Sequence, residues 1–271
     1  IHEQYNGTAW TEATDLNTAR LTNAGAGTTT SALAPIGKNP GTSRVNNNES
    51  WDGSSWTEVS DVNTSRRDGG GIGASNTNAI IFGGAEFDSP PGSQSAKTEV
   101  WDGSSWTEVG DLSTARSTSG SAGVTNTAAL FFGPPAKNEQ WNGSSWTEVA
   151  DLNTDRQYPG GAGTSTAALA IGGDTDPGIT AVTESWDGAS WTEVADLGTA
   201  RRQNFGSGVN TAALATGGYT TAQVANTEEF SAAGPTDSII NTGQVFYRSD
   251  TGDMKVTLNV LGTGAWATGG A

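Results

Sequence analysis

Carboxylates recur along this sequence at a spacing that could support acid–base chemistry. A Thr-Glu-x-x-Asp pattern places two acids three residues apart, as in Glu108 with Asp111 and Glu193 with Asp196. General acid–base catalysis uses such carboxylate pairs. The same pair occurs in every copy of the repeat described below, and an arginine follows each aspartate by five residues. A feature that all copies share is expected to hold them together, so we interpret the acids as structural partners of the arginines between neighbouring repeats.

A second acidic segment, Asp174-Thr-Asp176-Pro-Gly178, spaces two carboxylates ahead of a glycine, somewhat as calcium-binding loops do. It lacks the third acid and the distal glutamate of such loops, so a solvated β-turn is the favoured interpretation, with Asp174 and Asp176 as weak calcium candidates. The chain has no cysteine and its one histidine is His2, which excludes thiolate and multi-histidine metal sites. We therefore expect no metal and no cofactor.

Composition narrows the partners and the fold. The net charge is −16, with only 13 Lys and Arg and no basic cluster, which disfavours nucleic acid and anionic membranes as partners. No apolar run approaches the ~18 residues of a transmembrane helix. The 38 glycines and the low charged fraction of 15% argue against long amphipathic helices and favour an all-β chain.

An internal repeat organises most of the chain. Each copy has two aromatic residues five positions apart, and an arginine stands fifteen positions after the first aromatic. The aromatic pairs are Tyr5 and Trp10, Trp51 and Trp56, Trp101 and Trp106, Trp141 and Trp146, and Trp186 and Trp191. The arginines are Arg20, Arg66, Arg116, Arg156 and Arg201.

The repeat predicts four short strands. Its aromatics bracket an Asp-Gly or Asn-Gly step, as at Asp102-Gly103, which is a strong hairpin signal and defines strands three and four. A Gly/Ala-rich stretch such as SAGVTNTAALFFG supplies strands one and two, with small residues in an innermost strand crowded around an axis. Because one such unit cannot bury both its faces, copies must stack, and radial stacking gives a β-propeller.

One copy of the repeat shows a resemblance to a known family. WTEVADLGTAR (191–201), followed by two strands ending at Gly217-Gly218 and an E-x-aromatic segment, resembles the kelch repeat family of propellers. The resemblance covers residues 1–230 and implies a kelch-like propeller. It departs from the family in that only three copies keep the double glycine.

Five blades can be counted. We expect the fifth to close by borrowing the N-terminal strand around Trp10. The alternative is a six-bladed ring with a further repeat upstream of Ile1, because HEQY (2–5) itself has the pattern of a third strand. The predicted organisation is a propeller over 1–230, a linker over 231–243 and a C-terminal β-hairpin segment over 244–271.

The C-terminal segment has a different pattern. GQVFYRSDTGDMKVTLNVLGTGAW contains two alternating runs around a turn, hence a hairpin. It resembles a short module of bacteriophage tail-fibre and other virion proteins. The final Trp266-Ala-Thr has the pattern of a fourth strand, either of another propeller or as an alternative closing strand for this one.

Two enzyme sites known in propellers are not matched. A galactose-oxidase-type copper site needs a crosslinked Cys and two His ligands, which this composition excludes. The segment SWDGSSW (50–56) resembles the Asp-box of sialidase-like propellers but lacks one residue, and no arginine cluster accompanies it. We therefore expect no enzymatic activity.

Binding is expected where the repeats differ, in the connections between strands two and three. These loops, at 38–47, 85–98, 174–182 and 219–226, should emerge on one face of a propeller. Phe87, Asp88 and Tyr219 are the candidate ligand-binding residues, because aromatic rings suit sugar rings or a protein patch.

The sequence thus predicts a non-catalytic virion or extracellular protein. Its favoured role is a bacteriophage tail-fibre or surface-decoration component that binds a host glycan, a receptor or other virion proteins. A homo-oligomer is compatible with this role. A general kelch-type interaction module is the alternative, and an extracellular propeller enzyme is a weaker one.

Overall fold

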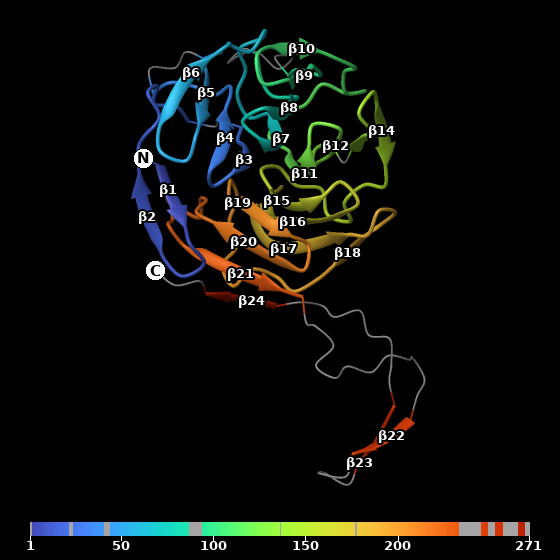
Figure 1. The fold of residues 1–271 in the computed structure, drawn as a ribbon. Helices are drawn as coiled ribbons and strands as arrows, with labels where there is room; N and C mark the ends of the chain where they lie inside the picture. Colours follow the sequence, from blue (N-terminus) through green and yellow to red (C-terminus); the bar gives the residue numbers. More distant parts are fainter. Residues whose placement is uncertain are drawn as a thin grey trace.

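The computed structural model describes residues 2–21, 24–40, 44–86, 94–135, 137–176 and 178–232, together with the backbone of three strands at 245–248, 253–256 and 265–268. Five antiparallel sheets of four strands each are arranged radially, as the blades of a β-propeller (Figure 1). The all-β fold predicted from the repeats is confirmed. The described residues contain no helix that could cross a membrane.

The blades follow one another in chain order. The first contains β3 (Ala26–Thr28), β4 (Ser31–Ala34), β5 (Asn48–Trp51) and β6 (Trp56–Val59). The second contains β7 (Gly70–Ser75), β8 (Asn78–Phe82), β9 (Thr98–Trp101) and β10 (Trp106–Glu108). The third contains β11 (Gly120–Thr125), β12 (Ala128–Phe132), β13 (Asn138–Trp141) and β14 (Trp146–Val149). The fourth contains β15 (Gly160–Thr164), β16 (Ala167–Thr175), β17 (Gly178–Trp186) and β18 (Trp191–Glu193).

The fifth blade contains β19 (Phe205–Val209), β20 (Ala212–Thr216), β21 (Thr227–Ser231) and β24 (Ala265–Thr268). Its closing strand therefore comes from the C-terminus, with Ala265 opposite Ser231 (Figure 1). The expected closure by the strand around Trp10 is wrong. That strand, β2 (Trp10–Ala13), pairs instead with β1 (His2–Tyr5) across a tight turn. A local hairpin closes a shorter loop than any pairing across the ring, and so costs less chain entropy.

The C-terminal hairpin is confirmed as β22 (Val245–Arg248) paired with β23 (Asp253–Val256). Most of the linker expected over 231–243 lies outside the described residues, although β21 extends to Ser231.

The acidic turn of the repeat forms each outer hairpin. In the second blade the Asp102 Oδ1 atom accepts the main-chain N–H groups of Ser104 and Ser105 at 2.8 and 2.9 Å. Gly103 takes φ +101°, which a residue with a Cβ rarely adopts. The turn brings Trp101 opposite Trp106 with ring centroids 5.4 Å apart, and both rings are buried. The tryptophan pairs are thus part of the scaffold, as the repetition indicates.

The repeated arginines are buried and paired, but not with the expected acids. Their partner is a glutamate of the third strand of the blade that follows each arginine. The nitrogen-to-oxygen distances are 2.5 Å for Arg20–Glu49, 3.1 Å for Arg66–Glu99, 3.3 Å for Arg116–Glu139, 2.7 Å for Arg156–Glu184 and 3.0 Å for Arg201–Glu228. The acids of the Thr-Glu-x-x-Asp pattern have other roles. Asp111 accepts the N–H of Thr98, and the half-exposed Glu108 lies 3.8 Å from Lys97.

The core is divided among the spaces between blades. Four apolar clusters fill the spaces from the first to the fifth blade, each with a large aliphatic residue of a second strand. On β15 next to the axis only glycine fits, since a Cβ on Gly161 would lie 2.1 Å from the carbonyl oxygen of Ser121 on β11. This contact confirms that the innermost strands are crowded and explains their small residues.

Candidate functional site

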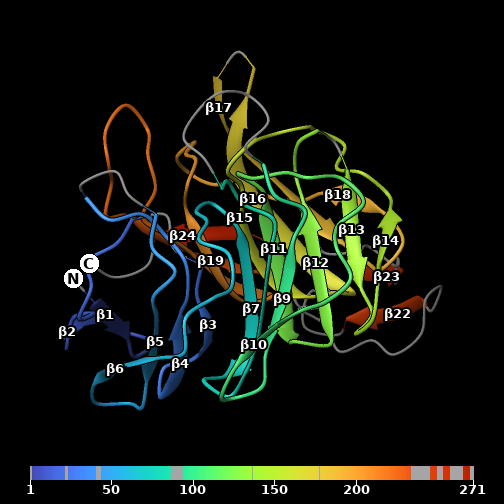
Figure 2. The same ribbon diagram turned by 90° about the horizontal axis from the view of Figure 1, so that it is seen from above.

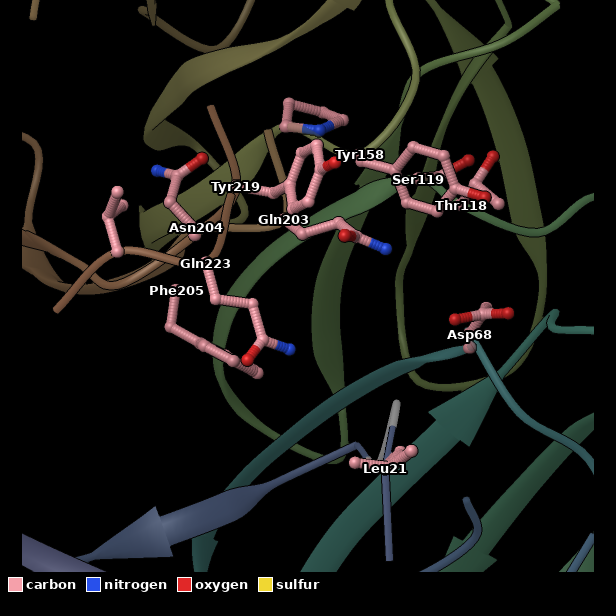
Figure 3. A pocket seen from close by; sticks show the side chains of 14 residues that line it. Leu21, Asp68, Thr118, Ser119, Tyr158, Gln203, Asn204, Phe205, Tyr219 and Gln223 are labelled. Atoms are coloured by element: carbon pink, nitrogen blue, oxygen red, sulfur yellow. The ribbon is translucent and has the colours of Figure 1, made fainter. Parts of the chain in front are cut away.

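A pocket of about 520 Å³ lies where the connectors of the blades meet, in front of the innermost strands (Figure 3). We call it the axial pocket. Its lining residue Tyr158 follows Gln157, which is hydrogen-bonded to Asp174 of β16, so the pocket lies near the base of the β16–β17 hairpin. Figure 2 shows this hairpin projecting from the ring of blades. Each blade contributes a residue that stands one or two positions after its buried arginine. These are Leu21, Asp68, Thr118, Tyr158 and Gln203.

Four of these residues share an uncommon backbone conformation. Asp68, Thr118, Tyr158 and Gln203 have φ of 56°, 63°, 55° and 57°, in the left-handed region that favours glycine. They are linked in sequence around the axis, because Thr118 N donates to Asp68 O at 3.1 Å, Tyr158 N to Thr118 O at 2.5 Å and Gln203 N to Tyr158 O at 2.9 Å. Strained conformations of this kind concentrate at ligand sites, where the surrounding structure maintains them.

The side chains on this fixed backbone differ from blade to blade. They present a carboxylate, a hydroxyl, a phenol and an amide to the same space (Figure 3). Asp68 is the only carboxylate among the described lining residues, and it is paired with the neighbouring Arg67. The arrangement offers directional hydrogen bonds with little net charge, which suits a neutral polar ligand.

An aromatic wall stands on one side of the pocket. The guanidinium carbon of Arg202 lies 5.8 Å from the ring centroid of Tyr158 and 5.1 Å from that of Tyr219. Burial raises the pKa of the Tyr158 phenol, and the Asp68 carboxylate raises it further. Tyr158 is therefore a neutral hydrogen-bond donor at physiological pH.

The carboxylate of Asp174 forms an ion pair with an arginine side chain. Its Oδ2 atom lies 2.5 Å from Arg202 Nη1, whereas Asp176 is exposed at the tip of the β16–β17 hairpin. Across the described ranges, no three His, Cys, Asp or Glu side chains gather in a way that could hold a metal ion. The geometry thus assigns Asp174 to positioning Arg202 beside the tyrosines.

Asn204 adds a buried amide to the pocket wall. Its side chain is only 5% exposed, and neither the Nδ2 nor the Oδ1 atom has a hydrogen-bond partner within the described part of the chain. Leaving a buried polar group unpaired costs about 1–3 kcal/mol. Both amide atoms have almost no exposed surface, so Asn204 forms part of the wall and does not present its amide to a ligand.

The structure places one of the candidate positions from the sequence at this pocket and brings other residues to it. Tyr219 lines the pocket, whereas Phe87 and Asp88 lie outside the described residues. The sequence analysis missed Asp68, Thr118, Tyr158 and Gln203. The signal that could have identified them is variation at a constant distance of two residues after the repeated arginine.

Comparison with known proteins supports the fold alone. No protein-family model matches the chain, and no curated protein matches it. A solved structure described as "Structure of YjhT" superposes with a TM-score of 0.69, over 88% of this chain and 89% of that chain, at 12% identity. The chain is therefore a β-propeller protein with five four-stranded blades and a polar pocket at the centre of one face.

Proposed function

We propose that this chain is a non-catalytic binding protein whose ligand site is the axial pocket. The observation that carries the proposal is the constant backbone at Asp68, Thr118, Tyr158 and Gln203, on which the side chains differ. A rigid frame with varied side chains is typical of recognition, where loops on a scaffold carry function. A propeller fold suits such a binding role.

Within this class, a saccharide is the ligand that the chemistry favours. The Tyr158 and Tyr219 rings line the pocket with the Arg202 guanidinium against them, and Gln203 offers an amide donor and acceptor beside them. The volume of about 520 Å³ falls in the usual range of small-ligand sites. The single carboxylate, already paired with Arg67, supports binding rather than glycoside hydrolysis, which uses two carboxylates.

The proposed setting is a bacteriophage particle, as a tail-fibre or surface-decoration component that binds a host-surface glycan. This rests on the kelch-like repeat and on the resemblance of the C-terminal segment to virion modules. It implies a virion or extracellular location and contacts with other virion proteins.

A glycan array tests the ligand class. The intact chain should bind a restricted set of glycans, and Tyr158→Ala should lower that binding at least about tenfold with an unchanged melting temperature. Val124→Ala is the matched control, because Val124 is 54% exposed on the opposite end of an inner strand. Binding of a host surface protein with no glycan bound would favour an interaction module instead. Turnover of a bound glycan would contradict the non-catalytic role, and immunogold labelling of native particles tests the virion setting.

A further inference from the structure

The ring of blades has one sector that differs from the rest. The first strands of successive blades pack side by side, β3 against β7, β7 against β11, β11 against β15 and β15 against β19. Among the described strands, β19 and β3 show no comparable packing. The apolar clusters follow the same rule, since the described residues form none between the fifth blade and the first. A sixth sector therefore lies between these two blades (Figure 1).

The β1–β2 hairpin occupies the outer half of this sector. Trp10 Nε1 donates to Thr227 Oγ1 of the fifth blade at 3.2 Å, the same bond that Trp146 makes to Thr98 of the preceding blade at 2.9 Å. The Tyr5 and Trp10 rings lie 5.2 Å apart, like the tryptophan pairs of the complete blades. On its other side, the His2 ring lies 4.7 Å from the Trp51 ring of the first blade. The hairpin thus stands where strands three and four of a sixth blade would be.

The inner half of the sector exposes residues that are buried everywhere else. Leu214 of β20 is half-buried, although its equivalents are at most 1% exposed, namely Leu33, Ile80, Leu130 and Leu169. Phe205 of β19 is 65% exposed, where the other blades have a buried alanine or glycine. Ser207 is exposed at a position that is buried in all four other blades. The face of the fifth blade toward this sector is therefore uncovered.

Gly25 of the first blade also lacks a neighbouring strand on the side of the sixth sector. Its equivalents approach the backbone of the preceding blade, with a Cβ on Gly161 2.1 Å from Ser121 O and one on Gly206 2.4 Å from Gly161 O. A Cβ on Gly25 would have no atom within 4 Å. Gly25 thus lacks the neighbouring backbone that its equivalents on β15 and β19 approach.

We infer that the inner half of the sixth sector is a strand-acceptor site, and that its occupant is a Gly/Ala-rich antiparallel strand pair joined to the N-terminal end of β1. In all five blades the third strand pairs with the second strand of its own sheet, which directly precedes it in the chain. β1 holds the place of a third strand, so its inner edge can accept a second strand by main-chain hydrogen bonds. Small residues would lie at the axis, and alternating large aliphatic and aromatic residues would cover Leu214. Phe205 also lines the axial pocket, but the inference rests on strand packing and not on the identity of the ligand.

A grafted extension tests this inference. Residues 117–137 precede Asn138-Glu139-Gln140-Trp141 of the third blade, and His2-Glu3-Gln4-Tyr5 repeats that pattern, so the segment can be placed ahead of His2 in register. In hydrogen exchange, we expect the amides of β1 and β19 to exchange at least about tenfold more slowly in the extended protein than in the original chain. The melting temperature should rise as well.

Gly25→Val provides the matched control. In the original chain it should not lower the melting temperature, because a Cβ there meets no atom within 4 Å, whereas in the extended chain it should remove the added protection. A scrambled extension should give no protection. The inference is overturned if the grafted segment leaves the exchange of β1 and β19 unaltered. It is equally overturned if ultracentrifugation and exchange show that β19 of the original chain is covered by a second copy.

Discussion

The guanidinium of Arg156 lies 2.7 Å from the Oε1 atom of Glu184, and neither side chain has exposed surface. The other oxygen of Glu184 accepts the main-chain N–H of Asn153 at 2.7 Å. One glutamate therefore joins the third strand of a blade to the connector that leads into that blade. Burial lowers the pKa of Arg156, and the Glu184 carboxylate opposes that shift. The opposite charge of Glu184 thus offsets part of the cost of burying the guanidinium.

Breaking this pair should be costly. Arg156→Ala leaves a buried carboxylate without its cation, and we expect the free energy of unfolding to fall by about 3–5 kcal/mol. Urea denaturation followed by tryptophan fluorescence measures the change. Lys137→Ala is the control, because Lys137 and Glu148 form an ion pair 2.7 Å long whose side chains are 40% and 53% exposed. That surface pair should contribute less than about 1 kcal/mol. Equal losses in the two variants would contradict the structural role of the buried pair.

The second tryptophan of a blade should also be essential to stability. Trp106 is 6% exposed and packs in the cluster that joins the first two blades. Trp106→Ala removes this ring from a space that cannot fully collapse, so a loss of about 3–5 kcal/mol in the free energy of unfolding is expected. Chemical denaturation gives the value. A loss under about 1 kcal/mol would mean that the ring is exposed in solution and available to a ligand.

The scaffold could be predicted from the sequence because it depends on repeated local signals. The Asp102-Gly103 step and the pair of tryptophans around it define a hairpin within a few residues. The identity of the closing strand could not be predicted in this way. Trp10 and Trp266 begin segments of the same pattern, and the choice between them depends on the pairing of β2 with β1.

The pocket residues could not be predicted from the sequence for a different reason. Threonine and tyrosine are not residue types that indicate a left-handed backbone. At Thr118 and Tyr158 the hydrogen bonds between blades impose that conformation. The acid partner of each arginine is also set by tertiary packing, since Glu184 is 28 residues from Arg156. Spacing along the chain therefore favoured the nearer, but wrong, acids.

The acidic turns predict a pH dependence of stability. Main-chain hydrogen bonds from Ser105 and Ser104 lower the pKa of Asp102 to about 2 in the folded protein. The folded pKa is below the ordinary value of about 3.9, so the stabilisation is complete above that pH and is lost as the pH falls through about 2.

Asp102→Asn should remove this part of the acid sensitivity without disrupting the turn. Asn142 already holds the equivalent turn of the third blade, with its Oδ1 atom accepting the N–H groups of Ser144 and Ser145 at 3.0 Å. Thermal melts between about pH 4 and pH 2 should show a shallower decline for the variant. NMR titration of the Asp102 carboxyl in the original protein checks the midpoint. An identical pH profile for both proteins would contradict the role of this carboxylate.

The left-handed residues of the axial pocket should lower the stability of the fold while contributing side chains to binding. At Thr118, with φ 63°, a residue with a Cβ has a strain of roughly 1–2 kcal/mol, which glycine avoids. The greater chain entropy of unfolded glycine offsets about 0.5–1 kcal/mol of that gain. We therefore expect Thr118→Gly to unfold at an equal or higher denaturant concentration, while binding at the pocket weakens through loss of the hydroxyl. Thr107→Gly makes the same change in the exposed strand β10, where it should lower stability by about 0.5–1 kcal/mol. If both variants lose stability to the same extent, the backbone at Thr118 is not strained. The surrounding structure then does not force this residue into the left-handed conformation against its own preference.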